Sequence, residues 1–146
     1  MSENTKPANQ LLAALPAKEY QHLLPKLEEV SLTFAETIFE PNDIIRYVYF
    51  PNSGVISLFK HVREGDILEV GMVGNEGMVG LPVFLGVKKS NNQAIVQGDG
   101  TAVRIKTADF LRMRAKRFFA EITSAIHARA PYGSLAEGGL HSFTSD

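Results

Sequence analysis

The sequence predicts a mainly β protein, either a β-sandwich or a jelly-roll barrel, with short helices before the strands and one long helix after them. Short runs of apolar residues recur between positions 31 and 106, and Gly, Pro, Asn and Asp residues separate them. Apolar residues at helical spacing stand on both sides of this region. The 146 residues suit one domain, so all these elements are expected to share one fold.

The N-terminal part is predicted to hold two short helices. Residues 1–8 are polar and are expected to be disordered. From Leu11 to Leu27 the apolar residues follow helical spacing, and Pro16 suits the first turn of a helix. We therefore expect one helix to end near Leu15 and a second helix to begin at Pro16.

The region up to residue 106 is predicted to form strands joined by turns. Apolar and polar residues alternate in "VSLTFAETIF", which ends at a Pro-Asn-Asp turn. Further strand-like runs cover residues 47–51, 54–62, 67–73, 94–97 and 101–105. The turn sequences "PNSG", "REGD", "KKSNN" and "GDG" separate them. Asp99 and Gly100 stand between the last two runs and predict a β-hairpin there.

Thr107 suits the N-cap of a long helix that runs to Arg129, before Pro131. Five residues in it recur at alternating spacings of four and three, which is typical of a coiled-coil seam. They are Leu111, Ala115, Phe118, Ile122 and Ala125. Two interpretations stay open: the helix joins two copies of the chain, or it packs on its own domain. Residues 130–146 are rich in Gly and Ser and are expected to form an irregular tail.

The segment "GMVGNEGMVG" at residues 71–80 raises the question of a phosphate site, because glycine-rich turns can bind phosphate through backbone N–H groups. No Gly-Lys-Ser/Thr sequence follows these glycines and the order G-x-G-x-x-G is missing, so neither a P-loop nor a dinucleotide fingerprint is predicted. Gly71, Gly74 and Gly77 are expected at strand ends and in a tight turn, with Asn75 in a left-handed conformation.

The composition argues against several classes of function. The chain has no cysteine, which excludes disulfides, thiolate metal sites and cysteine nucleophiles. Its four histidines lack the close spacing of a metal site and no G-x-S-x-G sequence marks a nucleophile, so no catalytic, metal or cofactor site is predicted. A formal net charge of −1 argues against direct DNA binding. No apolar run suits a signal peptide or a membrane span, so the expected location is the cytoplasm.

Two stretches of the sequence resemble the bacterial Crp/Fnr family of transcriptional regulators. The first is "EPND" followed by "YFPNSGVISL", and the second is "VGNEGMVGLPVFLG". The resemblance covers residues 11–126. It implies a cyclic-nucleotide-binding-like jelly-roll domain over residues 9–106, with residues 107–129 as the helix that joins two subunits in a homodimer.

The resemblance also implies a ligand pocket between two strands. Family members that bind cyclic nucleotides carry a Gly-Glu step there, whose acid binds the ribose, and about ten residues later an arginine that neutralises the cyclic phosphate. The corresponding residues of this chain are Val79, Gly80, Leu81, Pro82, Asn92, Gln93 and Ala94. Leu81 replaces the acid and Asn92 replaces the cation, so cyclic AMP is expected to bind weakly or not at all. Lys88 and Lys89 could take the place of the arginine, although a solvated turn is the role expected of both.

The leading hypothesis is the sensor and dimerisation domain of a Crp/Fnr-like regulator, with a small-molecule effector of unknown identity. A stand-alone interaction module that binds a ligand other than cyclic AMP is one alternative. A cupin-type jelly-roll enzyme is another, although the missing His-x-His cluster argues against it. No helix-turn-helix pattern follows residue 129, so we expect a truncated or frame-shifted gene or a protein that works without DNA contact. This chain alone is expected to bind neither specific DNA nor a membrane.

Overall fold

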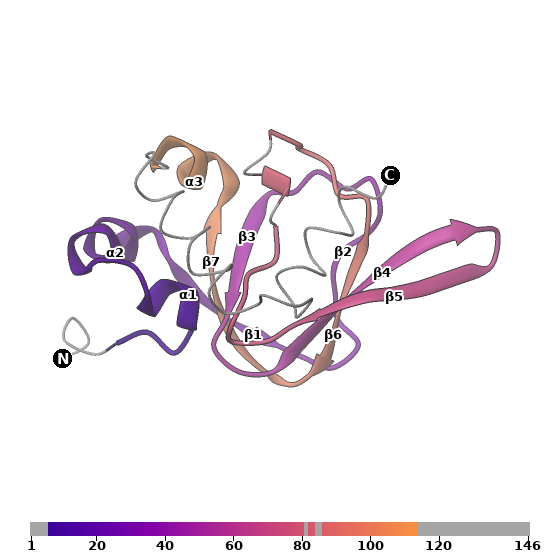
Figure 1. Cartoon of the computed structure of the whole chain (residues 1–146), viewed down its shortest axis with the longest axis horizontal. Coiled ribbons are helices and arrows are strands. Elements are labelled where there is room, and N and C mark those ends of the chain that lie inside the picture. Colours follow the sequence, from indigo (N-terminus) through magenta and orange to yellow (C-terminus); the bar gives the residue numbers. More distant parts are fainter. Residues whose placement is uncertain (1–5, 81, 84–85, 114–146) are drawn as a thin grey trace.

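The computed structural model describes residues 6–80, 82–83 and 86–113, which form mainly β structure with few helices (Figure 1). Helices α1 (Gln10–Ala13) and α2 (Ala17–Leu23) come first, followed by a 3-10 turn over Leu24–Lys26. The strands are β1 (Glu28–Leu32), β2 (Thr37–Phe39), β3 (Tyr47–Pro51), β4 (Val55–Arg63), β5 (Asp66–Val73), β6 (Gln93–Gly98) and β7 (Gly100–Lys106). Helix α3 (Thr107–Met113) follows them. The predicted break between two short N-terminal helices is confirmed. In the described part of the chain, no helix is long and apolar enough to cross a membrane.

The strands form two antiparallel sheets. One sheet has the order β1-β7-β3 and the other the order β2-β6-β4-β5. The five strand runs predicted between residues 47 and 105 are confirmed within one residue at each end. The alternating stretch before them forms two strands, β1 and β2, because the chain turns between them at Ala35, which has a φ of 74°.

The β-hairpin predicted at Asp99 and Gly100 is wrong, because β6 and β7 belong to different sheets. The turn carries the chain from one sheet to the other. Asp99 Oδ1 accepts a hydrogen bond of 2.7 Å from the Phe34 backbone N–H, which ties the turn to the segment after β1. A Cβ atom on Gly100 would lie 2.6 Å from Gly54 N, so two loops approach each other closely here. Strands β4 and β5 do form a hairpin, which projects beyond the rest of the sheets (Figure 1).

Two hydrophobic cores hold the layers together. The helices pack on the outer face of the β1-β7-β3 sheet, where the ring centroids of Phe50 and Phe110 lie 6.5 Å apart. The second core lies between the two sheets. Successive residues of β3 alternate between the cores, since Val48 and Phe50 belong to the first and Tyr49 to the second. This alternation decides which side chains of β3 can face a space between the sheets.

Asn9 joins the first helix to the strands. Its side chain is fully buried, and its Oδ1 accepts hydrogen bonds from Leu11 N (3.0 Å) and Leu12 N (3.2 Å), so it is the N-cap of α1. Its Nδ2 donates to Pro51 O (2.8 Å) and to Gly77 O (2.9 Å). One buried amide therefore satisfies backbone groups from a helix, a strand end and a turn.

The turn between Gly74 and Gly77 contacts the start of α1. Gly77 N donates to Gly74 O at 3.2 Å, which confirms the predicted tight turn. The left-handed conformation predicted for Asn75 is wrong, because this residue does not have a positive φ. Its backbone O accepts a hydrogen bond of 2.7 Å from Gln10 N, so contact with α1 fixes the turn.

Helix α3 covers the start of the long helix that the sequence predicts. Thr107 is the first helical residue and not the N-cap, and its hydroxyl donates to Ile45 O at 2.7 Å. Phe110 is fully buried, and Leu111 packs half-buried against the core under the helices. The other predicted seam residues, Ala115, Phe118, Ile122 and Ala125, lie outside the described residues, as do positions 1–5 and 130–146.

Candidate functional site

The first half of the predicted ligand pocket extends the β1-β7-β3 sheet. Val79 pairs antiparallel with Tyr49 through backbone hydrogen bonds of 2.8 and 2.9 Å. Gly80 follows with a φ of 118°, and a Cβ atom on it would lie 3.2 Å from a side chain of β3. Pro82 is buried in a short 3-10 turn, whereas Leu81 lies outside the described residues. Backbone conformation alone therefore accounts for the glycine at position 80.

The second half of the predicted pocket begins with a closed turn. Asn92 is fully buried, and the Ser90 hydroxyl donates to Asn92 O at 2.6 Å and accepts from Asn92 N at 3.0 Å. The Gln93 side chain donates to Glu40 Oε1 at 3.0 Å on an exposed surface. Ala94 is buried in the core between the sheets. A neutral, enclosed residue thus stands where the resemblance expects an arginine.

The structure brings parts of the predicted pocket together in the core between the sheets. Val79 and Ala94 belong to the same core cluster. None of the six described residues of this pocket lines either of the two cavities described below. A ligand site at these residues stays a prediction.

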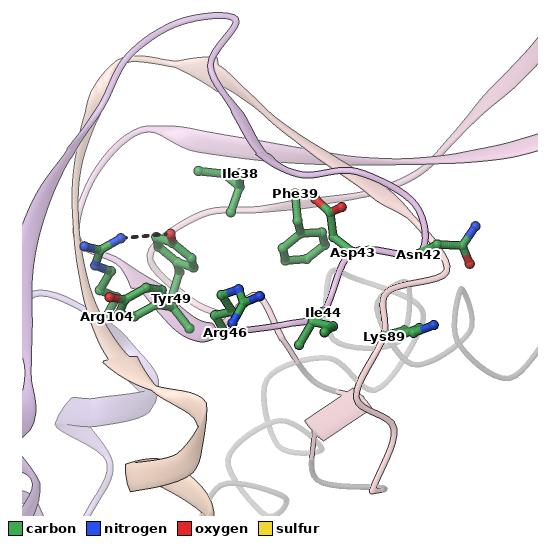
Figure 2. A pocket seen from close by; sticks show the side chains of 10 residues that line it. Ile38, Phe39, Asn42, Asp43, Ile44, Arg46, Tyr49, Lys89 and Arg104 are labelled. Carbon is green, nitrogen blue, oxygen red and sulfur yellow. Dashed lines mark hydrogen bonds between the residues drawn. The ribbon is translucent and has the colours of Figure 1, made fainter.

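A cavity of about 600 Å³ opens beside the core between the sheets (Figure 2). Its walls come from β2, β3 and β7, from the loop that joins β2 to β3, and from the segment before β6. Its lining consists of Ile38, Phe39, Asn42, Asp43, Ile44, Arg46, Tyr47, Tyr49, Lys89 and Arg104. Three of these residues are cations and one is an acid, so the lining carries a formal charge of +2 in a chain whose net charge is −1.

Arg104 is held in place by three neighbours. Its Nε donates to Glu28 Oε1 at 3.0 Å, its Nη1 donates to the Tyr49 hydroxyl at 3.3 Å, and its guanidinium carbon lies 3.8 Å from the ring centroid of Tyr47. Desolvation lowers the pKa of Arg104, but the hydrogen bonds to Glu28 and Tyr49, with the charge on Glu28, raise this pKa by more. The pKa therefore lies above its ordinary value, and the guanidinium is charged and fixed in orientation.

The other charged residues of the cavity come from loops. In Figure 2, Arg46 lies between Arg104 at one end of the cavity and Lys89 at the other, and the Lys89 amine points outward. Within the described chain, neither Arg46 nor Lys89 forms an ion pair. Asp43 Oδ2 accepts a hydrogen bond of 2.8 Å from Glu40 N, so this acid stabilises its own turn. The cavity therefore has an excess of positive charge that its own acid does not neutralise.

Reasoning from the sequence missed this cavity. Arg104 lies in the predicted run at residues 101–105, and Tyr47 and Tyr49 lie in the run at 47–51, but both runs predicted only strands. Strand alternation puts Arg104 on the same face as Ala102, which is a usable indication. The pairing of Tyr49 with Arg104, however, depends on the register of β3 on β7.

A second cavity, of about 570 Å³, shares Ile44, Arg46 and Tyr47 with the first and reaches α3. Its walls are mainly apolar and include Val83 and Leu111. No group of three or more His, Asp or Glu side chains that could hold a metal ion occurs among the described residues.

A family model of the cyclic nucleotide-binding domain matches residues 29–117, which is more than half of the chain. The matched range runs from β1 into α3 and beyond it. No curated protein matches the sequence significantly.

Several solved structures have the same fold. The N-terminal domain of a transcriptional regulator from Streptomyces coelicolor A3(2) has a TM-score of 0.65 and 17% identity, over 86% of this chain and 91% of that one. Catabolite activator protein from Thermus thermophilus has a TM-score of 0.65 and 18% identity, over 83% and 56%. The regulatory subunit of a cAMP-independent protein kinase A from Trypanosoma cruzi, bound to guanosine, has a TM-score of 0.69 and 12% identity, over 94% and 49%. This chain therefore spans only about half the length of the last two proteins, and the likeness is one of fold.

Proposed function

Because this chain belongs to the cyclic nucleotide-binding domain family, we propose that it is the sensor domain of a Crp/Fnr-type transcriptional regulator that responds to a ligand other than cyclic AMP. The observation that carries the proposal is the pair of uncharged residues, Leu81 and Asn92, at the positions where the resemblance expects an acid and a cation. The burial of Asn92 supports it, because a fully enclosed side chain is not accessible to the phosphate group of a ligand that enters from solvent. The guanosine-bound kinase subunit supports it too, because guanosine carries no phosphate.

The missing charges are expected to have a large effect on affinity. A hydrogen bond to a charged group contributes ~1.5–3 kcal/mol, and two such bonds are lost here. If the two losses add, the affinity for cyclic AMP falls by roughly two to four powers of ten relative to a domain with both charges. The glycine at position 80 remains, but its N–H alone cannot replace an acid and an arginine.

Titration of the protein with cyclic AMP in a calorimeter is expected to give no saturable heat at concentrations up to ~1 mM. The variant Leu81→Glu with Asn92→Arg restores both charges and is expected to improve the affinity at least ~10-fold. The matched control is Leu81→Gln with Asn92→Gln, which adds polar groups without charge.

Because Asn92 is buried, thermal unfolding of both double variants establishes that they are folded before the titration. A dissociation constant in the low micromolar range for the unmodified protein would contradict the proposal. If the charged variant gained nothing over the neutral one, the alignment of the two positions with the family would be wrong.

We also propose that the helix over residues 107–129 joins two copies of the domain. The support is the seam of apolar residues at alternating spacings of four and three, which continues past the described end of α3. Two of the five seam residues are alanines, and Leu111 already contacts the core of its own domain, so the dimer is expected to be weak.

Sedimentation velocity is expected to show a concentration-dependent dimer that Ile122→Asp converts to monomer, because the substitution puts an unpaired charge in the seam. Thr123→Asp adds the same charge one residue away, outside the seam, and is expected to leave the dimer unchanged. A single monomeric species at all concentrations, for the unmodified protein as well as for both variants, would exclude this role of the helix.

Direct DNA binding is not part of the proposed function. Affinity for a duplex comes largely from an excess of Lys and Arg that contacts phosphates, and the formal net charge of this chain is −1. The basic run "RMRAKR" at residues 112–117 falls within the helix that the sequence predicts, and a solvated face is its expected role.

A further inference from the structure

We propose that the cavity lined by Arg46 and Arg104 binds a small organic anion, one with a planar apolar body and a single carboxylate, sulfonate or phosphate group. This site is separate from the predicted pocket at positions 79–82 and 92–94, none of whose described residues lines the cavity. Its volume of about 600 Å³ lies in the range of small-molecule sites in proteins. The inference rests on the proposed sensing role only where it makes the bound ligand an effector. Binding to the cavity itself can be measured directly.

Arg104 is the residue expected to bind the anionic group. A guanidinium has five N–H donors, and Arg104 uses one on Glu28 and one on Tyr49. The other three have no partner among the residues that the structure describes. The contacts with Glu28, Tyr49 and the Tyr47 ring fix the side chain before a ligand arrives, so little rotamer entropy is lost on binding. The side chain is 24% exposed, which leaves it accessible from the cavity.

Arg46 supplies a second positive charge, which adds to the part of the Arg104 charge that Glu28 does not offset. Glu28 offsets part of the charge on Arg104, but it is 59% exposed and is screened by solvent. Arg46 lies nearer the middle of the cavity in Figure 2 and has no ion pair with a described residue. Asp43 is the acid of the lining, and its hydrogen bond to Glu40 N occupies it. A monoanion between the two arginines would therefore meet a net positive surface.

The walls of the cavity favour an apolar body over a bare inorganic ion. Phe39, Tyr47 and Tyr49 contribute aromatic surface to the lining, and Ile38 adds an aliphatic side chain from β2. Ile44 also lines the cavity and is 51% exposed, which is unusual for a large aliphatic side chain. A planar ligand can cover this surface while its charged group binds the guanidinium groups.

Fluorescence titration with anilinonaphthalene sulfonate tests the inference, because this probe joins an anionic group to a planar apolar body. Its neutral analogue, N-phenyl naphthylamine, has the same body without the charge. The sulfonate is expected to bind the full chain at one site and more tightly than the neutral analogue. Arg46→Gln and Arg104→Gln are each expected to weaken sulfonate binding roughly 10-fold and to leave the neutral analogue unchanged. Arg63→Gln removes the same charge from the exposed end of β4 and is expected to change neither.

Arg104→Gln also removes contacts to Glu28 and Tyr49, so its thermal unfolding is recorded, and Arg46→Gln provides the variant without described side-chain partners. In nitrogen-15 spectra the Nε–H signals of Arg46 and Arg104, but not of Arg63, are expected to shift on titration with the sulfonate. Equal binding of the charged and neutral probes, or unchanged sulfonate affinity in both cavity variants, would overturn the inference. The cyclic AMP titration does not affect this outcome, so failure of one proposal is distinguishable from failure of the other.

Discussion

Replacing Gly100 with alanine is expected to destabilise the protein by about 3 kcal/mol, because the new Cβ atom would overlap with the backbone of a neighbouring loop. A Cβ atom at this position would meet the carbonyl group of Ser53 and would lie 2.6 Å from Gly54 N. These are backbone atoms, so no side-chain rotation can relieve the overlap. The loop after β3 and the turn before β7 must separate, which disturbs the place where the chain crosses between the sheets.

Gly98→Ala is the matched control, two residues earlier, at the end of β6. A Cβ atom there would lie 3.7 Å from Val55 N, which is an ordinary contact, and Gly98 does not have a positive φ. Its effect is expected to stay within ~1 kcal/mol. The chain has no tryptophan, so urea unfolding is followed by circular dichroism and by the fluorescence of its four tyrosines. Equal midpoints for the two variants would contradict the close approach of the two loops.

The position of Gly100 also illustrates what the sequence alone could not predict. Asp99-Gly100 between two strand runs is a hairpin sequence on local grounds. In the structure, the glycine is required for a different reason, because its backbone closely approaches Ser53 and Gly54, nearly fifty residues earlier in the chain. Strand limits depend on local alternation and turn residues, and those of the five runs between residues 47 and 105 were predicted within one residue. The sheet to which each strand belongs depends on distant pairing, and the wrong hairpin followed from this difference.

Of the two candidate sites, one could be predicted from the sequence and the other could not. The pocket at positions 79–82 and 92–94 came from the resemblance, and its two missing charges can be read from the sequence. The cavity could not be predicted, because Tyr49 and Arg104 are adjacent only through the register of β3 on β7, and Glu28 joins Arg104 through the register of β1 on β7. The burial of Asn92 also required the structure, since its turn is closed by hydrogen bonds to Ser90.

Asn9→Asp is expected to destabilise the protein by about 2–4 kcal/mol, although the two side chains have nearly the same shape. A carboxylate keeps the acceptor for Leu11 N and Leu12 N, so the N-cap of α1 is preserved. It loses both amide donors, and a fully buried negative charge would then face the carbonyl oxygens of Pro51 and Gly77. The loss of stability therefore comes from the hydrogen bonds of Asn9 to Pro51 O and Gly77 O, which join the helix to the strands, and not from the helix cap.

Two further variants separate these contributions in urea unfolding. Asn9→Ala removes all four hydrogen bonds without adding a charge, and it is expected to cost about 2–6 kcal/mol, since each bond contributes roughly 0.5–1.5 kcal/mol. Asn91→Asp makes the same chemical change at an exposed turn and is expected to stay within ~0.5 kcal/mol. If Asn9→Asp matched Asn91→Asp, the amide donors of Asn9 would contribute nothing to the joint. If Asn9→Ala alone were severe, the cap would carry the stability, because the carboxylate preserves only the cap.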